Sequence, residues 1–184
     1  LYKGFLSPLR SKVTGKKLDT TGVHKRGAEF IESELQAAVN TDENNAALVS
    51  EIMARANGRK SWLLFCVGVQ HAQAMADALI AAGVKAECVT GATPKKERER
   101  IIASFKAGEI TALTNANVLT TGFDAPDTDL IVLARPTLSP ALYVQMAGRG
   151  MRLKSHIDDC LVLDFAGCVE THGPVTAVIP PSRS

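Results

Sequence analysis

Short apolar runs alternate with amphipathic or alanine-rich segments through most of the chain. The apolar runs have the length of buried strands, and they fall at residues 62–67, 85–89, 110–113, 130–133 and 160–165. Segments with helical character lie between them, at residues 70–82, 93–108 and 139–147. This alternation predicts an α/β domain with a parallel sheet and crossover helices.

Two of these helical segments begin with a clear start signal. Thr93-Pro94 and Ser139-Pro140 each place an N-cap residue before a proline at the first helical position. Upstream, the pattern predicts helices at residues 28–39 and 46–56, with polar residues 41–44 between them. The first 27 residues show no long period, and they predict a linker with room for one short strand.

The composition fits a soluble domain with a real core. Apolar residues make up 46% of the 184 residues and charged residues 22%, and no apolar run approaches the roughly 18 residues of a membrane helix. We therefore expect no membrane partner. The chain begins with Leu1 rather than Met and carries no signal-peptide pattern, so we expect a fragment of a longer cytoplasmic protein.

The four cysteines form no C-x-x-C pair, which favours free thiols in a reducing cytoplasm. A zinc site built from Cys160, Cys168, His156 and His172 is the alternative, but its spacing fits no finger pattern, and we predict no metal site. Residues 1–26 carry seven basic residues against the single Asp19, a net charge of +6. This segment is either a solvated linker or a strand that lies along phosphates.

Small polar residues follow three successive predicted strands. Parallel sheets bind ligands beyond the carboxyl ends of their strands, and exposed backbone amides in such loops suit phosphates. Ordinary βα turns use the same residue types, so the loops alone leave both interpretations open. The residues that we predict to contact a phosphate chain are Gly68, Gln70, Gly91, Thr93, Asn115 and Asn117.

A second group of candidates lies just after the helix predicted at 139–147. Arg149 and Arg152 stand three residues apart, with Gly148 and Gly150 allowing close approach of the backbone. Two arginines at a helix end also favour the helix dipole, which is the simpler explanation. Because the glycines would break a helix needlessly for that purpose, the pattern favours an anion clamp, such as one for a nucleotide phosphate.

With these residues assembled, the chain resembles the C-terminal motor domain of superfamily 2 helicases. Residues 145–152 resemble motif VI, Q-x-x-G-R-x-x-R, and residues 121–126 resemble the G-x-D-x-P core of motif V. Residues 64–67 resemble the strand of motif IV, and residues 91–98 the loop and helix after the next strand. Within the superfamily, the chain is similar to the branch of RadD-like proteins and the translocase subunits of type I and III restriction enzymes.

The resemblance implies a RecA-like fold, of the P-loop NTPase type but without its own Walker A loop, that acts in an ATP-dependent nucleic-acid helicase or translocase. ATP and Mg²⁺ would be bound mainly by a preceding RecA-like domain that this chain lacks, so the isolated chain should not hydrolyse ATP. DNA is the expected partner over RNA. The resemblance gives Arg152 the role of arginine finger and also implies nucleotide contacts for Arg149, Gln145, Gly122, Asp124 and Gly148.

One departure concerns Asn117. Many helicases carry Ala-Thr-Asp-Val shortly before the motif V glycine, whereas residues 116–118 here read Ala-Asn-Val.

Two rival interpretations concern the function. One is a non-catalytic module with a degenerate motor fold. The other is a Rossmann-type enzyme, which would need a G-x-G-x-x-G turn that this sequence lacks. We expect a linker and lead-in helix at residues 1–43, the motor domain at 44–170 and a tail at 171–184.

Overall fold

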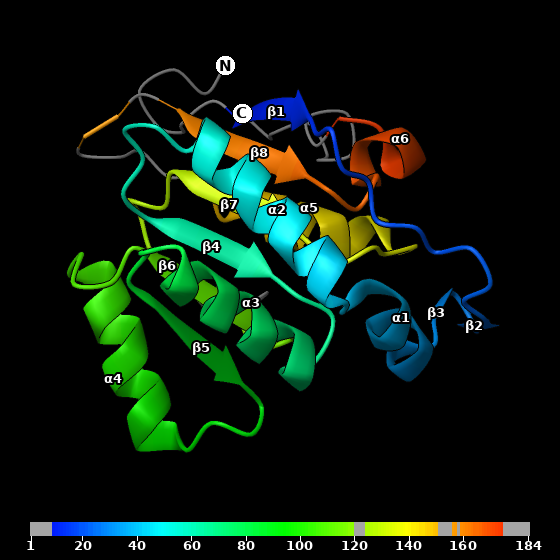
Figure 1. Cartoon of the computed structure of the whole chain (residues 1–184), viewed down its shortest axis with the longest axis horizontal. Coiled ribbons are helices and arrows are strands. Elements are labelled where there is room, and N and C mark those ends of the chain that lie inside the picture. The colour runs from blue at the N-terminus through cyan, green and yellow to red at the C-terminus, as the bar shows by residue number, and fades with distance from the viewer. Residues whose placement is uncertain (1–8, 120–123, 151–155, 158, 175–184) are drawn as a thin grey trace, which may run out of the picture.

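The core of the molecule is a six-stranded parallel sheet in the order β1-β8-β7-β4-β6-β5 (Figure 1). The computed structural model describes residues 9–119, 124–150, 156–157 and 159–174. In sheet order the strands are β1 (Leu9–Val13), β8 (Cys160–Asp164), β7 (Leu130–Leu133), β4 (Trp62–Phe65), β6 (Ala112–Ala116) and β5 (Ala86–Thr90). The predicted fold class, an α/β parallel sheet of RecA type, is confirmed.

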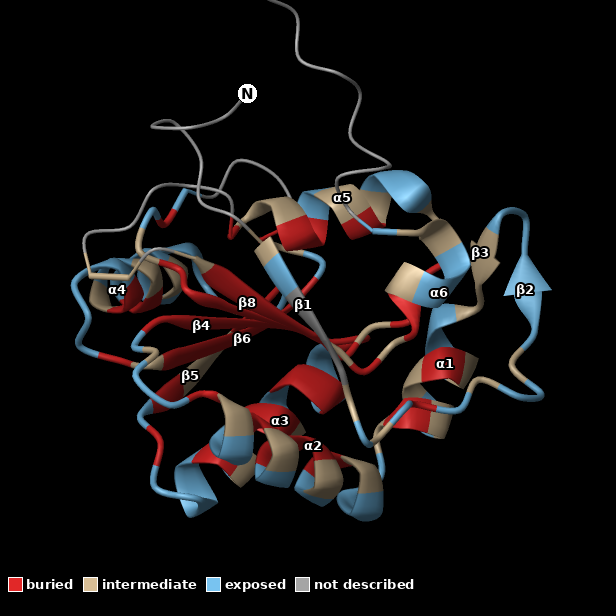
Figure 2. Ribbon diagram, turned by 90° about the horizontal axis from the view of Figure 1, so that it is seen from above, coloured by how far each residue is buried: buried red, intermediate tan, exposed pale blue. Residues whose placement is uncertain are grey.

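Helices cover both faces of this sheet (Figure 2). One face carries α1 (Glu32–Val39), α2 (Asp42–Arg55) and α3 (Val69–Ala81), and the other carries α4 (Lys95–Lys106), α5 (Pro140–Gly148) and the short α6 (Cys168–His172). Alternate residues of the central strand β4 serve the two cores: Leu64 packs with the first layer and Leu63 with the second. Both faces are buried, which explains the unbroken apolar runs in the sequence.

The N-terminal part differs from the prediction. Residues 9–13 form the edge strand β1, which pairs in parallel with β8; the predicted linker left room for one short strand but gave it no position. Residues 28–31, expected to begin a helix, belong instead to a small hairpin of β2 (Lys25–Arg26) and β3 (Glu29–Phe30). Helix α2 begins four residues earlier than predicted, because the Thr41 side chain accepts a hydrogen bond from Asn44 N at 3.1 Å and caps it.

The basic N-terminal segment is tied to the rest of the domain at two described positions. Arg10 is ion-paired with Asp159, and Lys17 with Glu170. Hydrogen bonds from the backbone amides of Gly15 and Lys16 to the Glu51 carboxylate fix the chain between them. These contacts agree better with a docked strand than with a free linker. Within the described ranges, no helix combines the length and apolar character needed to cross a membrane.

Candidate nucleic-acid interface

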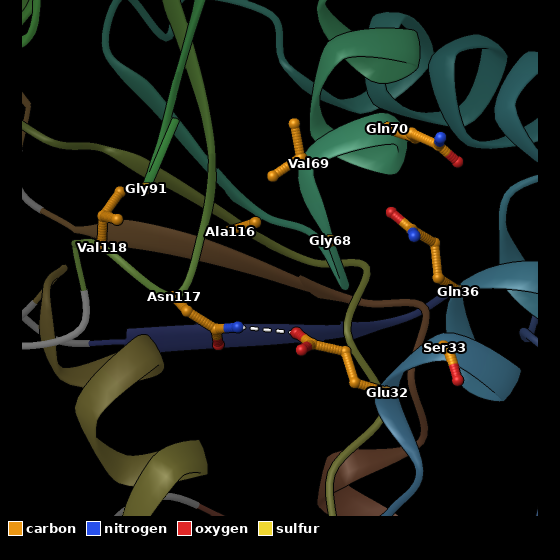
Figure 3. Close-up of a pocket in the computed structure, with 10 residues that line it drawn as sticks. All are labelled: Glu32, Ser33, Gln36, Gly68, Val69, Gln70, Gly91, Ala116, Asn117 and Val118. Carbon is orange, nitrogen blue, oxygen red and sulfur yellow. Dashed lines mark hydrogen bonds between the residues drawn. The ribbon is translucent and has the colours of Figure 1, made fainter. Parts of the chain in front are cut away.

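A cleft of about 570 Å³ opens at the carboxyl edge of the sheet, beside α1 (Figure 3). In Figure 1 the strand arrows point toward the side where α1 and the β2–β3 hairpin lie. The cleft is lined by residues from the loops after β4, β5 and β6, and from α1: Glu32, Ser33, Gln36, Gly68, Val69, Gln70, Gly91, Ala116, Asn117 and Val118. Four of the six residues predicted to contact phosphates, Gly68, Gln70, Gly91 and Asn117, therefore meet in one cleft.

Gly68 lies close to a side chain of α1. A β-carbon on residue 68 would stand 2.3 Å from Gln36 Oε1, a contact that no local pattern predicts. The same oxygen accepts a hydrogen bond from the backbone N–H of His71 at 3.0 Å, in the first turn of α3. Gln36 thereby caps the start of α3 and holds α1 against the cleft.

Asn117 lies just beyond the end of β6 in a left-handed conformation, with φ of 63°. Asparagine tolerates this region better than most residues, and such strain is often found at functional positions. Its Nδ2 donates to Glu32 Oε1 at 2.7 Å, and its Oδ1 accepts from Arg135 Nη1 (Figure 3 shows the first of these bonds). Glu32 and Arg135 are therefore further members of the cleft region that sequence reasoning missed.

Two of the predicted contact residues belong to the scaffold instead. Asn115 is fully buried: its Nδ2 donates to Leu64 O at 2.9 Å and its Oδ1 accepts from Leu119 N at 3.4 Å. Thr93 does not line the cleft, and it does not cap α4, whose N-cap residue is Pro94. Its hydroxyl accepts from Thr90 N at 3.0 Å and closes the turn after β5. The predictions of a ligand contact for the Asn115 side chain and of a cap for Thr93 were wrong.

The predicted nucleotide contacts centre on α5. Ser139 caps this helix by accepting from Leu142 N at 3.1 Å, with Pro140 in its first turn, as predicted. Gln145 is exposed on its outer face, and Arg149 is half-buried at its C-cap. Asp124 is exposed. Arg152 and Gly122 lie outside the described residues.

The two glycines flanking Arg149 differ in what surrounds them. A β-carbon on Gly150 would stand 2.3 Å from Cys160 Sγ and 2.8 Å from Cys160 Cβ, whereas no described atom lies within 4 Å of one built on Gly148. The backbone of Gly150 therefore lies close against Cys160 of β8, which leaves no room for a side chain at residue 150. Gly148 leaves open space beside Arg149.

Glu29 of the β2–β3 hairpin fixes the turn that leads into α5 through two hydrogen bonds. The Thr137 hydroxyl donates to the Glu29 carboxylate, and Leu138 N donates to Glu29 Oε1 at 2.9 Å. His172 Nε2 is hydrogen-bonded to Thr137 O at 2.9 Å, and its ring stacks on Tyr143 of α5. Segments from both ends of the described chain therefore position the helix that carries Gln145 and Arg149.

Burial sets the titration of the core thiols and of one histidine. It raises the pKa of the Cys66 thiol, and it raises that of Cys168 to about 12, so neither is a reactive thiolate. Burial also lowers the pKa of His71 to about 4. All four cysteines are free, and among the described residues no three His, Cys, Asp or Glu side chains gather in a group that would hold a metal.

Comparison with known proteins identifies the domain. Residues 43–154 match the family described as "Helicase conserved C-terminal domain". The yeast protein named ATP-dependent helicase IRC3, from Saccharomyces cerevisiae, is 35% identical over 161 residues, which cover 85% of this chain and 23% of the relative. A pre-mRNA-splicing ATP-dependent RNA helicase, PRP28 of Yarrowia lipolytica, is 26% identical over 64% of this chain and 20% of its own length.

Among solved structures, an HsdR-subunit fragment of a type I restriction enzyme from Vibrio vulnificus YJ016 superposes with a TM-score of 0.74. It is 25% identical and is matched over 93% of this chain and 34% of its own. The resemblance to superfamily 2, including its restriction-subunit branch, is confirmed. The chain spans about a quarter of the length of the curated relatives it matches.

Proposed function

Because the chain belongs to the family of helicase conserved C-terminal domains, we propose that it is the second RecA-like lobe of an ATP-dependent nucleic-acid motor. The observation that carries this proposal is the convergence of Gly68, Gln70, Gly91 and Asn117, which follow three different strands, on one cleft at the carboxyl edge of the sheet. That edge is where open parallel sheets bind their ligands.

The cleft is suited to a nucleic-acid backbone. Its glycines expose backbone amides, and Gln70 and Asn117 add amide side chains, so it offers donors to phosphates without an aromatic residue among the lining side chains. Such a lining would contact the phosphate backbone whatever the base sequence, as a translocating motor requires. We propose DNA as the strand, supported by the similarity to the restriction-enzyme subunit; RNA is the alternative that the experiment includes.

On the other face of the sheet from α1, α5 and its C-cap carry Gln145 and Arg149, which would help to complete a nucleotide site on a neighbouring lobe. In the proposed mechanism Arg152 is the arginine finger, Arg149 a second phosphate contact and Gln145 a sensor of the γ-phosphate, while Gly122, Asp124 and Gly148 approach the nucleotide. A guanidinium that reaches the phosphoryl group only when the lobes close stabilises the charge of the transition state, which is worth roughly 10³–10⁵ in rate. Bound Mg²⁺ would neutralise phosphate charge, and we assign no ligand for it to this chain.

The closing of the two lobes around ATP would then drive movement. Hydrolysis would release them, and the cleft loops would shift along the strand relative to the grip of the first lobe. We place no P-loop in this chain, so catalysis needs the longer protein of which it would be a part.

The test uses that longer protein, purified as wild type, as Arg152→Ala and as Arg55→Ala. Arg55 lies on α2, where it pairs with Glu51, and serves as an arginine control. We expect Arg152→Ala to lower the nucleic-acid-stimulated ATPase rate at least 10³-fold while single-strand binding changes little. An ATPase rate within about threefold of wild type would remove the finger assignment, and no stimulation by either DNA or RNA would favour the non-catalytic module.

A further inference from the structure

Three charged or polar side chains from distant parts of the sequence meet at the rim of the cleft, which Glu32 and Asn117 line. Glu32 comes from α1, Asn117 from the end of β6 and Arg135 from the end of β7. The Asn117 amide joins the other two, since it donates to Glu32 Oε1 at 2.7 Å and accepts from Arg135 Nη1. Arg135 Nη1 also lies 3.4 Å from Glu32 Oε1 and 3.3 Å from Val67 O.

Arg135 is buried more deeply than its partners justify. Only 11% of its side chain is exposed, and among the described residues no acceptor lies within hydrogen-bonding distance of its buried Nε. Glu32, its carboxylate partner among the described residues, lies 3.4 Å away, and its side chain is 49% exposed. A buried guanidinium with incomplete partners is costly, and an anion that binds beside it would offset this cost.

Glu32 occupies the place where such an anion would bind. Its carboxylate accepts from the same two side chains that would serve a phosphate, and it does so at the rim of the cleft proposed to hold a nucleic-acid backbone (Figure 3). Carboxylate and phosphate oxygens take the same donors, and the planar guanidinium of arginine pairs with either anion. Two anions cannot share the donors without repulsion, so one excludes the other.

We propose that Arg135 and the Asn117 amide form a phosphate subsite, and that the Glu32 carboxylate fills this subsite until a backbone phosphate displaces it. This inference rests on the proposed function of the cleft. Because Glu32 lies on α1, nucleic-acid binding would also release one of the contacts that hold α1 against the sheet. Glu32 acts as an internal competitor, and its cost appears as weaker apparent binding.

The size of the effect follows from the fraction of time for which the subsite is open. A subsite that is open about a tenth of the time weakens apparent binding about tenfold. Glu32→Gln keeps the shape and the acceptor for Asn117 but loses the charge that holds Arg135. We therefore expect Glu32→Gln to tighten binding of a 20-nucleotide oligothymidylate by about 3- to 10-fold in the longer protein.

The matched control is Glu34→Gln, on the same helix. Glu34 bonds to the exposed His24 and does not line the cleft. We expect it to bind as wild type does. Arg135→Gln should weaken binding, lower the slope of log Kd against log salt by about one, and remove the gain from Glu32→Gln when the two are combined.

Thermal unfolding of each variant comes first. If Arg135→Gln fails to fold, the binding of Glu32→Gln compared with that of Glu34→Gln still tests whether the Glu32 carboxylate competes with a phosphate. Equal or weaker binding by Glu32→Gln overturns the inference, since it makes Glu32 a structural residue. Wild-type protein that binds no oligonucleotide overturns the proposed function instead, so the two failures are distinguishable.

Discussion

The side-chain oxygen of Gln36 occupies the space beside Gly68, 2.3 Å from where a β-carbon of residue 68 would stand. The same oxygen caps α3 through His71 N, and Gly68, the N-cap residue of α3, has no side chain to do so. A helix upstream of the matched helicase region thus completes the first loop of the cleft. The contact makes one glycine of the cleft structural, whatever ligand the cleft binds.

We expect Gly68→Ala to lower the free energy of unfolding by about 1 kcal/mol, the worth of a capping hydrogen bond. The loss stays modest because the end of the Gln36 side chain is able to turn away. Urea denaturation of the chain measures it. Gly91→Ala is the control, since no described atom lies within 4 Å of its added β-carbon. In a Gln36→Ala background, Gly68→Ala should cost nothing further; an equal loss in both backgrounds would show that Gln36 is not the cause.

A second pair of glycines gives a sharper contrast near Arg149. Gly150→Ala would press a β-carbon against Cys160 Cβ and Sγ, at 2.8 and 2.3 Å, and we expect a loss of about 1–3 kcal/mol from overpacking. Gly148→Ala adds a methyl group at the end of α5 in open space, and it should leave stability unchanged or raise it by up to ~1 kcal/mol. The melting temperatures of the two variants, each compared with wild type, measure this difference. The same shift in both would contradict the packing of Gly150 against β8.

The hydrophobic pattern predicted the order of the main strands and helices, because both faces of the sheet are buried. It missed the ends of strands where polar residues find buried partners. The strand predicted at residues 110–113 runs to Ala116, since the Thr114 hydroxyl donates to Ala72 O and the Asn115 amide donates to Leu64 O. The carbonyl that accepts from Asn115 lies 51 residues away in the sequence. Nothing local reveals such a partner, so the sequence pattern places Asn115 in a loop.

The same limit applies to the site. Glycines and amides after strands could be predicted as cleft residues, because strand ends of a parallel sheet share one edge. Glu32 and Gln36 could not, since they lie on a helix that reaches the cleft only through packing. Arg135 follows the β7 strand at the same edge, and that position was the one signal that could have drawn attention to it.

The two asparagines should therefore respond differently to substitution. Asn115→Ala leaves Leu64 O and Leu119 N without partners in the core, and we expect it to lower the free energy of unfolding by about 1–3 kcal/mol. Asn117→Gly removes the strain of a left-handed asparagine, and it should keep stability within about 1 kcal/mol of wild type. Chemical denaturation compares them. A larger loss for Asn117→Gly than for Asn115→Ala would reverse their assignment to cleft and core.

The buried His71 predicts a specific acid sensitivity. Its Nδ1 accepts from Val67 N at 3.0 Å, while its Nε2 is buried and has no partner among the described residues. The folded state therefore holds the ring neutral, with a pKa of about 4 against 6.5 for an exposed histidine. Between these two values the unfolded chain binds a proton that the folded chain does not, so stability falls as the pH drops from 6.5 to 4 and is unaffected by this group above 6.5.

At ~1.4 kcal/mol per unit of pKa shift, the loss across this window reaches about 3 kcal/mol. His71→Asn offers an oxygen to Val67 N and does not titrate, so its unfolding free energy should depend less steeply on pH between 6.5 and 4. Urea denaturation at half-unit pH steps measures the difference. If the His71→Asn and wild-type curves stay parallel through this window, His71 does not cause the acid sensitivity.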